Sequence, residues 1–166
     1  MFVKSPAGRL LTALFLIFSL ASPALVLAAS GQVPVLDSPS LVKMVMEEGK
    51  GKVTIISVFA SWCPPCKEEM PILVKTRSGV DNKDLLLVGL SVDESLGELK
   101  QFIKKYNVNF PVYTGTDELL QALGISGIPH MFIFNRKGEL VESFVGLMPE
   151  PMFRAILARL LGESGV

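Results

Sequence analysis

The only two cysteines of the chain, Cys63 and Cys66, are separated by two prolines, and Cys63 directly follows the single tryptophan, Trp62. An apolar run rich in β-branched residues ends just before them, and a helix is predicted to begin at them. Helix N-termini carry unpaired N–H groups and the positive end of the helix dipole, and both stabilise a thiolate. The pattern therefore predicts thiol–disulfide exchange, with Cys63 on an exposed first turn as the nucleophile and Cys66 as the resolving thiol.

Two other uses of a closely spaced cysteine pair fit this sequence less well. A structural disulfide gains stability by closing a long loop, and a bridge across two residues would restrain the unfolded chain very little. A zinc site needs two more ligands, and the chain has one histidine, His130, and no second cysteine pair.

The N-terminus has the features of an export signal, because two basic residues precede an apolar run of eleven residues and small residues follow it. We expect residues 1–29 to form a signal peptide, with a cleavage site at Val26–Ala28, or an uncleaved membrane anchor. Residues 30–166 are expected to form one domain. Both interpretations place that domain in the periplasm or on the extracytoplasmic face of the membrane. Without the signal, 14 basic residues stand against 16 acidic ones, so no nucleic-acid partner is expected.

The elements that must position the cysteines are two buried strands. Residues 52–60 and 84–92 are almost wholly apolar, as in strands covered on both faces of a sheet. A helix is predicted after each of them. The first begins at Pro64 and is expected to kink at Pro71, and the second begins behind a capping box at Ser95–Glu98.

The remaining segments complete an α/β pattern. A helix over 38–49 precedes the first buried strand, and a short strand, a short helix, a hairpin with its turn at 135–138 and a closing helix follow the second helix. From the first buried strand onward the predicted order is β-α-β-α-β-α-β-β-α. This order predicts an α/β fold with a mixed central sheet and helices on both faces.

Four segments carry a resemblance to a known family. They are VFASWCPPCKEEMPIL, VGLSVDES, NFPVYTGTDELLQALGISGIPHMFIFNRKGELVESFVG and the closing helix, in that order. Together they resemble the TlpA/ResA-like thiol–disulfide oxidoreductases of the thioredoxin-like superfamily, the group that includes the cytochrome c maturation thioredoxins. The resemblance covers about residues 33–161. It implies the thioredoxin-like fold.

The resemblance also implies roles for particular residues. Cys63 and Cys66 match the redox pair, and Glu94 matches an acidic residue near the cysteines that helps substrate selection or proton transfer. Glu94 has a second interpretation as a solvated residue before the helix cap. Trp62, Ile128 and Pro129 match residues that contact substrate. Pro129 would be the cis-proline facing the pair, although the tripeptide alone favours a trans bond.

The sequence departs from the family pattern at two places. Ordinary thioredoxins have a buried aspartate where this chain has Ser57, so no proton transfer is expected there and Glu94 is the expected replacement. His130 follows the proline at a place where threonine is common. It is either a structural residue or, if charged and beside the pair, a group that stabilises the Cys63 thiolate.

The function implied by the resemblance is an exported protein-disulfide reductase without a cofactor or a metal. Its expected partners are exported proteins with disulfides, apocytochrome c among them, and a membrane electron donor of the CcdA/DsbD type. A monomer is expected. The alternatives are a net disulfide oxidant and a Cu(I)-binding metallochaperone that uses Cys63, Cys66 and His130.

Overall fold

Strand β2 (Val53–Phe59) is buried along its whole length and has neighbours on both sides in a six-stranded sheet. The structure is a computed structural model that describes residues 32–162, and the chain from Val33 onward forms a compact unit of its own. The predicted signal or anchor over 1–29 lies outside the described residues. Within 32–162, no helix has the length and apolar character needed to cross a membrane.

The elements follow one another largely as the sequence predicts. They are β1 (Val35–Leu36), α1 (Ser38–Lys43), the π-helical turn η3 (Met44–Glu48), β2 (Val53–Phe59), α2 (Pro64–Gly79), β3 (Leu85–Ser91), α3 (Leu96–Lys105), β4 (Val112–Gly115), α4 (Asp117–Ala122), β5 (His130–Phe134), β6 (Leu140–Val145) and α5 (Glu150–Gly162). The two-residue strand β1 was not predicted, since two residues carry no periodic pattern. Helix α2 continues through Pro71 without ending there.

The strand order of the sheet is β1-β4-β3-β2-β5-β6. Strands β2 and β3 run parallel and pair residue by residue from Val53 with Leu85 to Phe59 with Ser91. Strand β5 runs antiparallel to β2, and Val58 pairs with His130. The ends of β2 and β3 and the start of β5 therefore meet at one edge of the sheet. The loop that carries the cysteines leaves β2 at this edge.

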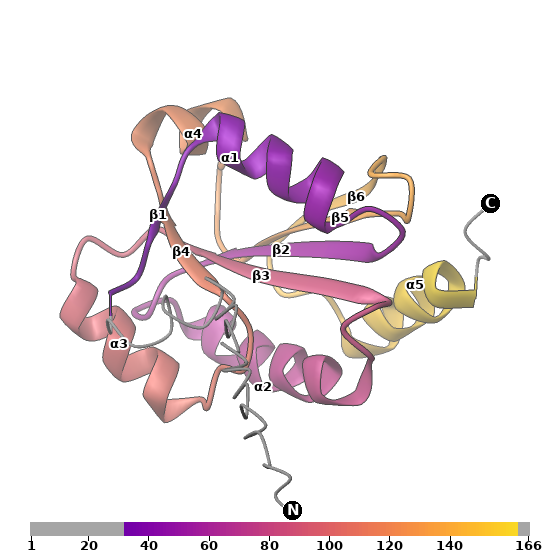
Figure 1. Cartoon of the computed structure of the whole chain (residues 1–166). Coiled ribbons are helices and arrows are strands. Elements are labelled where there is room, and N and C mark those ends of the chain that lie inside the picture. The colour runs from indigo at the N-terminus through magenta and orange to yellow at the C-terminus, as the bar shows by residue number, and fades with distance from the viewer. Residues whose placement is uncertain (1–31, 163–166) are drawn as a thin grey trace, which may run out of the picture. The chain divides into compact units, whose positions relative to one another are not determined.

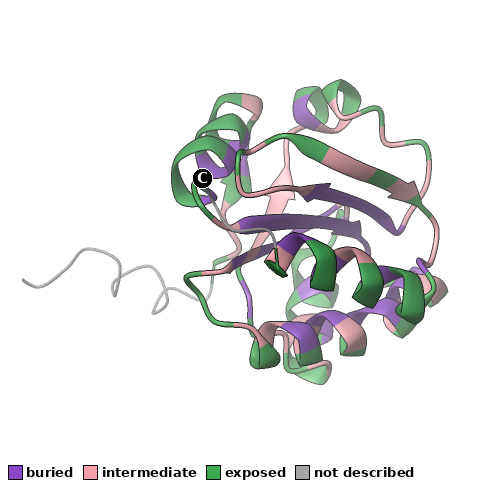
Figure 2. Cartoon of the chain, turned by 90° about the vertical axis from the view of Figure 1, so that its right-hand side faces the viewer, coloured by how far each residue is buried: buried purple, intermediate pink, exposed green. Residues whose placement is uncertain are grey.

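Helices cover both faces of the sheet, as Figure 1 shows. Helices α2, α3 and α5 pack on one face, where their buried residues join those of β2 and β3 in a core that includes both cysteines. Helix α1, the turn η3 and helix α4 pack on the other face, around a second core. The central strands are buried and the outer faces of the helices are exposed (Figure 2). The predicted mixed sheet with helices on both faces is confirmed.

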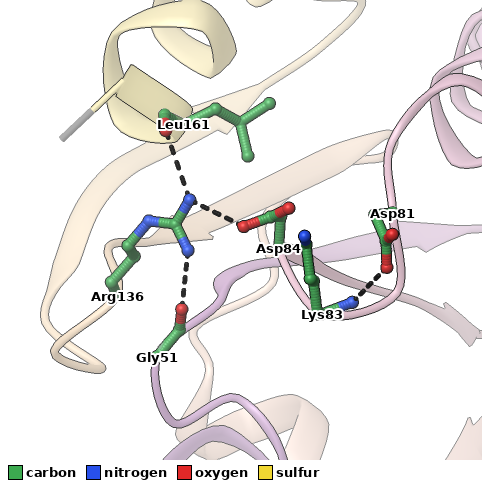
Figure 3. Close-up of polar contacts among 6 residues, drawn as sticks. All are labelled: Gly51, Asp81, Lys83, Asp84, Arg136 and Leu161. Carbon is green, nitrogen blue, oxygen red and sulfur yellow. Dashed lines mark hydrogen bonds and ion pairs between the residues drawn. The ribbon is translucent and has the colours of Figure 1, made fainter. Parts of the chain in front are cut away.

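Arg136 joins several segments at the end of the sheet opposite the cysteine loop. Its guanidinium donates to the carbonyl oxygen of Gly51 at 2.7 Å, just before β2, and to that of Leu161 at 3.2 Å, in α5. It also donates to a carboxylate oxygen of Asp84 at 3.1 Å, just before β3. Figure 3 shows the guanidinium between these three acceptors. One side chain thus links the hairpin turn, two strand starts and the closing helix.

Replacing Arg136 with alanine is expected to lower the free energy of unfolding by about 2–3 kcal/mol, because the partly buried Asp84 carboxylate and two carbonyls lose a charged donor. Urea unfolding of the wild-type and variant proteins measures this loss. Lys137→Ala serves as the matched control, because Lys137 is an exposed cation next to Arg136 in the same turn. Equal stability of Arg136→Ala and wild type would contradict the expectation.

Candidate active site

The cysteine pair lies at the junction of strand β2 and helix α2. Cys63 and Cys66 form a disulfide, with their Cα atoms 5.3 Å apart. Cys63 is the N-cap residue of α2, and the backbone N–H of Cys66 donates to its Sγ at 3.2 Å. The two prolines between them occupy the first turn, where their missing N–H groups would have no intrahelical partner. The helix end therefore directs an N–H group at the sulfur of Cys63, as the sequence pattern predicted.

The exposure of Cys63 differs from the expectation. We predicted an exposed first turn, yet Cys63 is only 2% exposed and Cys66 is fully buried. Both residues belong to the apolar core between the sheet and α2. Because the two exposures are so similar, the assignment of Cys63 as the nucleophile rests on its position at the helix end and not on its accessibility.

The segment before β5 faces the cysteine pair. The peptide bond between Ile128 and Pro129 is cis. The carbonyl oxygen of Ile128 lies 3.7 Å from Sγ of Cys63. The carbonyl oxygen of Pro129 accepts a hydrogen bond of 2.7 Å from the N–H of Gly146, which follows β6. The loop that contacts the disulfide is thereby attached to the edge hairpin.

Trp62 and Glu94 lie on the solvent side of the same edge. Trp62 is 59% exposed, which is unusual for the largest apolar side chain of a domain. Glu94 is exposed and lines a surface pocket together with Trp62. The structure thus brings Glu94 beside the tryptophan that precedes Cys63. It does not place Glu94 beneath the disulfide.

The carboxyl group within the core comes from Glu69, a residue that the sequence analysis did not select. Glu69 is 2% exposed, and its Oε2 accepts a hydrogen bond of 2.8 Å from the hydroxyl of Ser57. Its Oε1 is buried without a partner among the described residues. Glu69 follows Cys66 by three positions in α2 and therefore shares its helix face. No proton transfer was expected at Ser57, because the usual aspartate is missing there. The structure nevertheless has a carboxyl group at this place, which helix α2 supplies and which accepts the Ser57 hydroxyl.

Burial raises the pKa of Glu69 from 4.5 to about 7, although the hydrogen bond from Ser57 opposes the shift. A carboxyl group with this pKa takes up and releases protons near neutral pH, as an efficient general acid or base does. Glu69 could be singled out in the sequence only by its spacing of three positions from Cys66, which does not reveal its contact with Ser57. It falls in the buried stripe of α2, whose members are Cys66, Glu69, Met70, Leu73 and Thr76.

Asp93 is a second buried acid that the sequence analysis missed. It is 8% exposed and lies two residues beyond β3. Its carboxylate accepts hydrogen bonds from Ser61, which stands two residues before Cys63, and from Ser91. Asp93 therefore contacts the loop of the cysteine pair from the neighbouring strand.

His130 lies on the other face of the sheet from the disulfide. Its ring stacks on Phe132 with centroids 4.2 Å apart, and Phe132 belongs to the core under α1 and α4. Its Nε2 lies 2.9 Å from the hydroxyl of Ser143. Burial lowers the pKa of His130 and so favours the neutral ring. Of the two interpretations of His130, these contacts favour the structural residue.

The copper alternative loses its third ligand for the same reason. Cys63 packs in the core under α2, whereas the ring of His130 packs in the opposite core. Within residues 32–162, no group of three histidine, cysteine, aspartate or glutamate side chains is arranged to hold a metal ion.

Comparisons with known proteins show the family to which the chain belongs. The chain matches the Redoxin family over residues 36–160. It is 32% identical over 119 residues to the thiol-disulfide oxidoreductase ResA of Bacillus subtilis strain 168, a match that covers 71% of this chain and 66% of that protein. It is 31% identical over 103 residues to sporulation thiol-disulfide oxidoreductase A of the same organism, covering 60% of this chain and 62% of the relative. The chain thus spans slightly less than two thirds of the length of these two relatives.

A solved structure supports the fold. A thiol:disulfide interchange protein of the thioredoxin family from Chlorobium tepidum TLS is similar with a TM-score of 0.63 and 32% sequence identity, covering 69% of this chain and 83% of that one. These matches confirm the thioredoxin-like fold and the resemblance to ResA-like proteins. The chain therefore belongs to the Redoxin family, and its fold, cysteine pair and relatives are those of a thiol–disulfide oxidoreductase.

Proposed function

We propose that the protein is an exported reductase that uses Cys63 and Cys66 to reduce disulfides in partner proteins, apocytochrome c among them. The observation that carries this proposal is the disulfide itself, which caps a helix and lies against the carbonyl of Ile128. The titratable carboxyl group of Glu69 stands on the same helix face. A structural bridge would need neither the helix end nor the acid.

The exchange proceeds in two steps from the reduced pair. The Cys63 thiolate attacks one sulfur of the partner disulfide, a Cys63–partner bond forms, and the other partner sulfur leaves as a thiolate. Cys66 then attacks Sγ of Cys63, which forms the Cys63–Cys66 bond and releases the second partner sulfur. Two electrons pass from the pair to the partner. Glu69 accepts the proton that Cys66 loses in the second step, because it lies one helical turn beyond it.

Trp62, Ile128 and Pro129 form the contact surface for the partner in this proposal. Trp62 is exposed and directly precedes Cys63, and the carbonyl oxygen of Ile128 lies 3.7 Å from Sγ of Cys63. A membrane protein of the CcdA/DsbD type would return the pair to its reduced form. The protein would act as a monomer in the periplasm or at the extracytoplasmic face of the membrane.

A redox titration tests the direction of electron flow. We expect the Cys63–Cys66 pair to have a reduction potential of about −270 mV, in the range of reductases. We also expect it to reduce a disulfide-bonded peptide with the haem-attachment sequence C-x-x-C-H. A reduction potential of about −120 mV would assign the protein to the oxidants instead.

Mass spectrometry of the protein recovered from cells shows whether residues 1–29 are removed.

Glu94 is proposed to modulate the exchange without being essential. Its carboxylate shares a pocket with Trp62, so replacing it with glutamine is expected to shift the pH dependence of Cys63 reactivity and leave the fold intact. The measurement is the rate of iodoacetamide alkylation against pH. Glu118→Gln, which changes an exposed acid in α4, is the matched control. Superimposable curves for wild type and Glu94→Gln would leave Glu94 as a solvated residue before the Ser95 cap.

A further inference from the structure

We propose that Asp93 is a positioning residue for the exchange reaction, because its buried carboxylate fixes Ser61 and thereby sets the positions of Trp62 and Cys63. The inference rests on the proposed exchange activity of Cys63. It concerns a residue that does not contact the sulfur atoms and acts through the loop that carries them.

The contacts of Asp93 converge on one residue of that loop. Its Oδ1 accepts hydrogen bonds from the backbone N–H of Ser61 at 3.0 Å and from its hydroxyl at 2.6 Å. Its Oδ2 lies 2.9 Å from the same N–H. The backbone and the side chain of Ser61 are thus held by a single carboxylate.

Asp93 is itself held by the end of β3. The hydroxyl of Ser91 donates to its Oδ2 at 2.8 Å, and the backbone N–H of Asp93 donates to the hydroxyl oxygen of Ser91 at 2.9 Å. Ser91 in turn pairs with Phe59 at the last position of the β2–β3 ladder. These contacts hold the carboxylate in position relative to the sheet, independently of its contacts with Ser61.

Ser61 is a central residue of the turn that delivers the active residues. The N–H of Cys63 donates to the carbonyl oxygen of Ala60 at 3.2 Å, so Ser61 and Trp62 form the middle of a tight turn. Fixing the N–H of Ser61 fixes the plane of the peptide bond that enters this turn. Trp62 and Cys63 follow directly.

The contacts do more than join two strands. Strands β2 and β3 are already paired at seven consecutive positions that end with Phe59 and Ser91. The bonds from Ser61 to Asp93 lie beyond that ladder, where no strand pairing holds the turn. The position of Cys63 matters because its sulfur is nearly buried and receives the N–H of Cys66. A small displacement of reacting groups is enough to slow a reaction strongly.

The test compares full-length variants Asp93→Ala, Asp93→Asn and Ser61→Ala with wild type. The control is Asp37→Ala, which removes a carboxylate that also accepts a backbone N–H, from Ser40 at 2.9 Å, but caps α1. One measurement is the rate of reduction of a disulfide-bonded peptide. The other is the quenching of Trp62 fluorescence by acrylamide, which reports on this turn alone because Trp62 is the only tryptophan.

We expect Asp93→Ala to reduce peptides about tenfold more slowly and to show stronger quenching of Trp62. Asparagine keeps an oxygen acceptor for the Ser61 N–H, so Asp93→Asn should stay within about twofold of wild type. Ser61→Ala loses only the hydroxyl bond and should fall between them. Asp37→Ala should match wild type in both measurements.

Wild-type quenching and wild-type rate in Asp93→Ala would overturn the proposal. Equal losses in Asp93→Asn and Asp93→Ala would also overturn it, since they would assign the effect to charge. If Asp93→Ala does not fold, unchanged quenching and rate in Ser61→Ala decide against the proposal. Failure of the wild type to reduce any peptide disulfide would defeat the proposed function, and the quenching of Trp62 would still show whether Asp93 fixes the turn.

Discussion

Serine in place of Cys63 is expected to abolish disulfide exchange, whereas serine in place of Cys66 is expected to leave the protein covalently joined to its partners. Cys63 caps α2 and receives the N–H of Cys66, so its thiolate is the stabilised one. Without Cys66, the mixed disulfide on Cys63 has no internal thiol to resolve it. Non-reducing gels of cell extracts measure the trapped complexes.

The double variant Cys63→Ser/Cys66→Ser is the control and should trap no partner. All three variants should fold, because a bridge that spans two residues contributes little to stability. Complexes formed by Cys63→Ser and absent from Cys66→Ser would reverse the two roles.

Glutamine in place of Glu69 is expected to stabilise the folded protein at pH 8 by about 3 kcal/mol while slowing exchange about a hundredfold. The pKa of Glu69 is raised to about 7 in the fold from an ordinary value of 4.5, so the fold favours the protonated form. With respect to this group, the free energy of unfolding is highest below pH 4.5. It falls as the pH rises through about 7, because the unfolded chain ionises the carboxyl group more readily than the folded protein does. Glutamine removes that loss, because it is neutral at every pH and its amide oxygen still accepts the Ser57 hydroxyl.

Urea unfolding of the oxidised proteins at about pH 4 and about pH 8 measures the stability difference, and peptide reduction measures the rate. Glu68→Gln is the matched control, since Glu68 is the exposed neighbour on the same helix. Equal stability of Glu69→Gln and wild type at the higher pH would show that the carboxyl group is not destabilised by burial. An unchanged exchange rate would remove Glu69 from the proton transfer.

The strands and helices that position the cysteines were predictable because each carries a strong local signal. Residues 52–60 and 84–92 are apolar runs, and the structure has β2 and β3 within them. The cap at Ser95 was also predictable, and its hydroxyl accepts the backbone N–H of Glu98. Apolar runs and helix caps depend only on residues that are close in sequence, so they can be recognised without the structure.

The missed residues depend on contacts between distant segments. Glu69 meets Ser57 across twelve positions, and Asp93 meets Ser61 across thirty-two. A glutamate in an apolar helix stripe and an aspartate after a strand are ordinary in sequence. Their roles become visible only when the helix packs on the strand and two strands end at one edge. The burial of Cys63 has the same origin, because it results from packing of α2 and the Ile128 loop together.

The nearly complete burial of the disulfide affects which molecules can exchange electrons with it. Cys63 is 2% exposed and Cys66 is not exposed at all. A thiolate must approach a sulfur atom along the S–S axis to react, and the low exposure of Cys63 leaves little room for that approach. In the proposed function, contacts of a protein partner with Trp62 and the Ile128 loop would offset the cost of uncovering Cys63. If the protein acts as proposed, we expect the pair to exchange faster with proteins that dock on it than with small dissolved thiols.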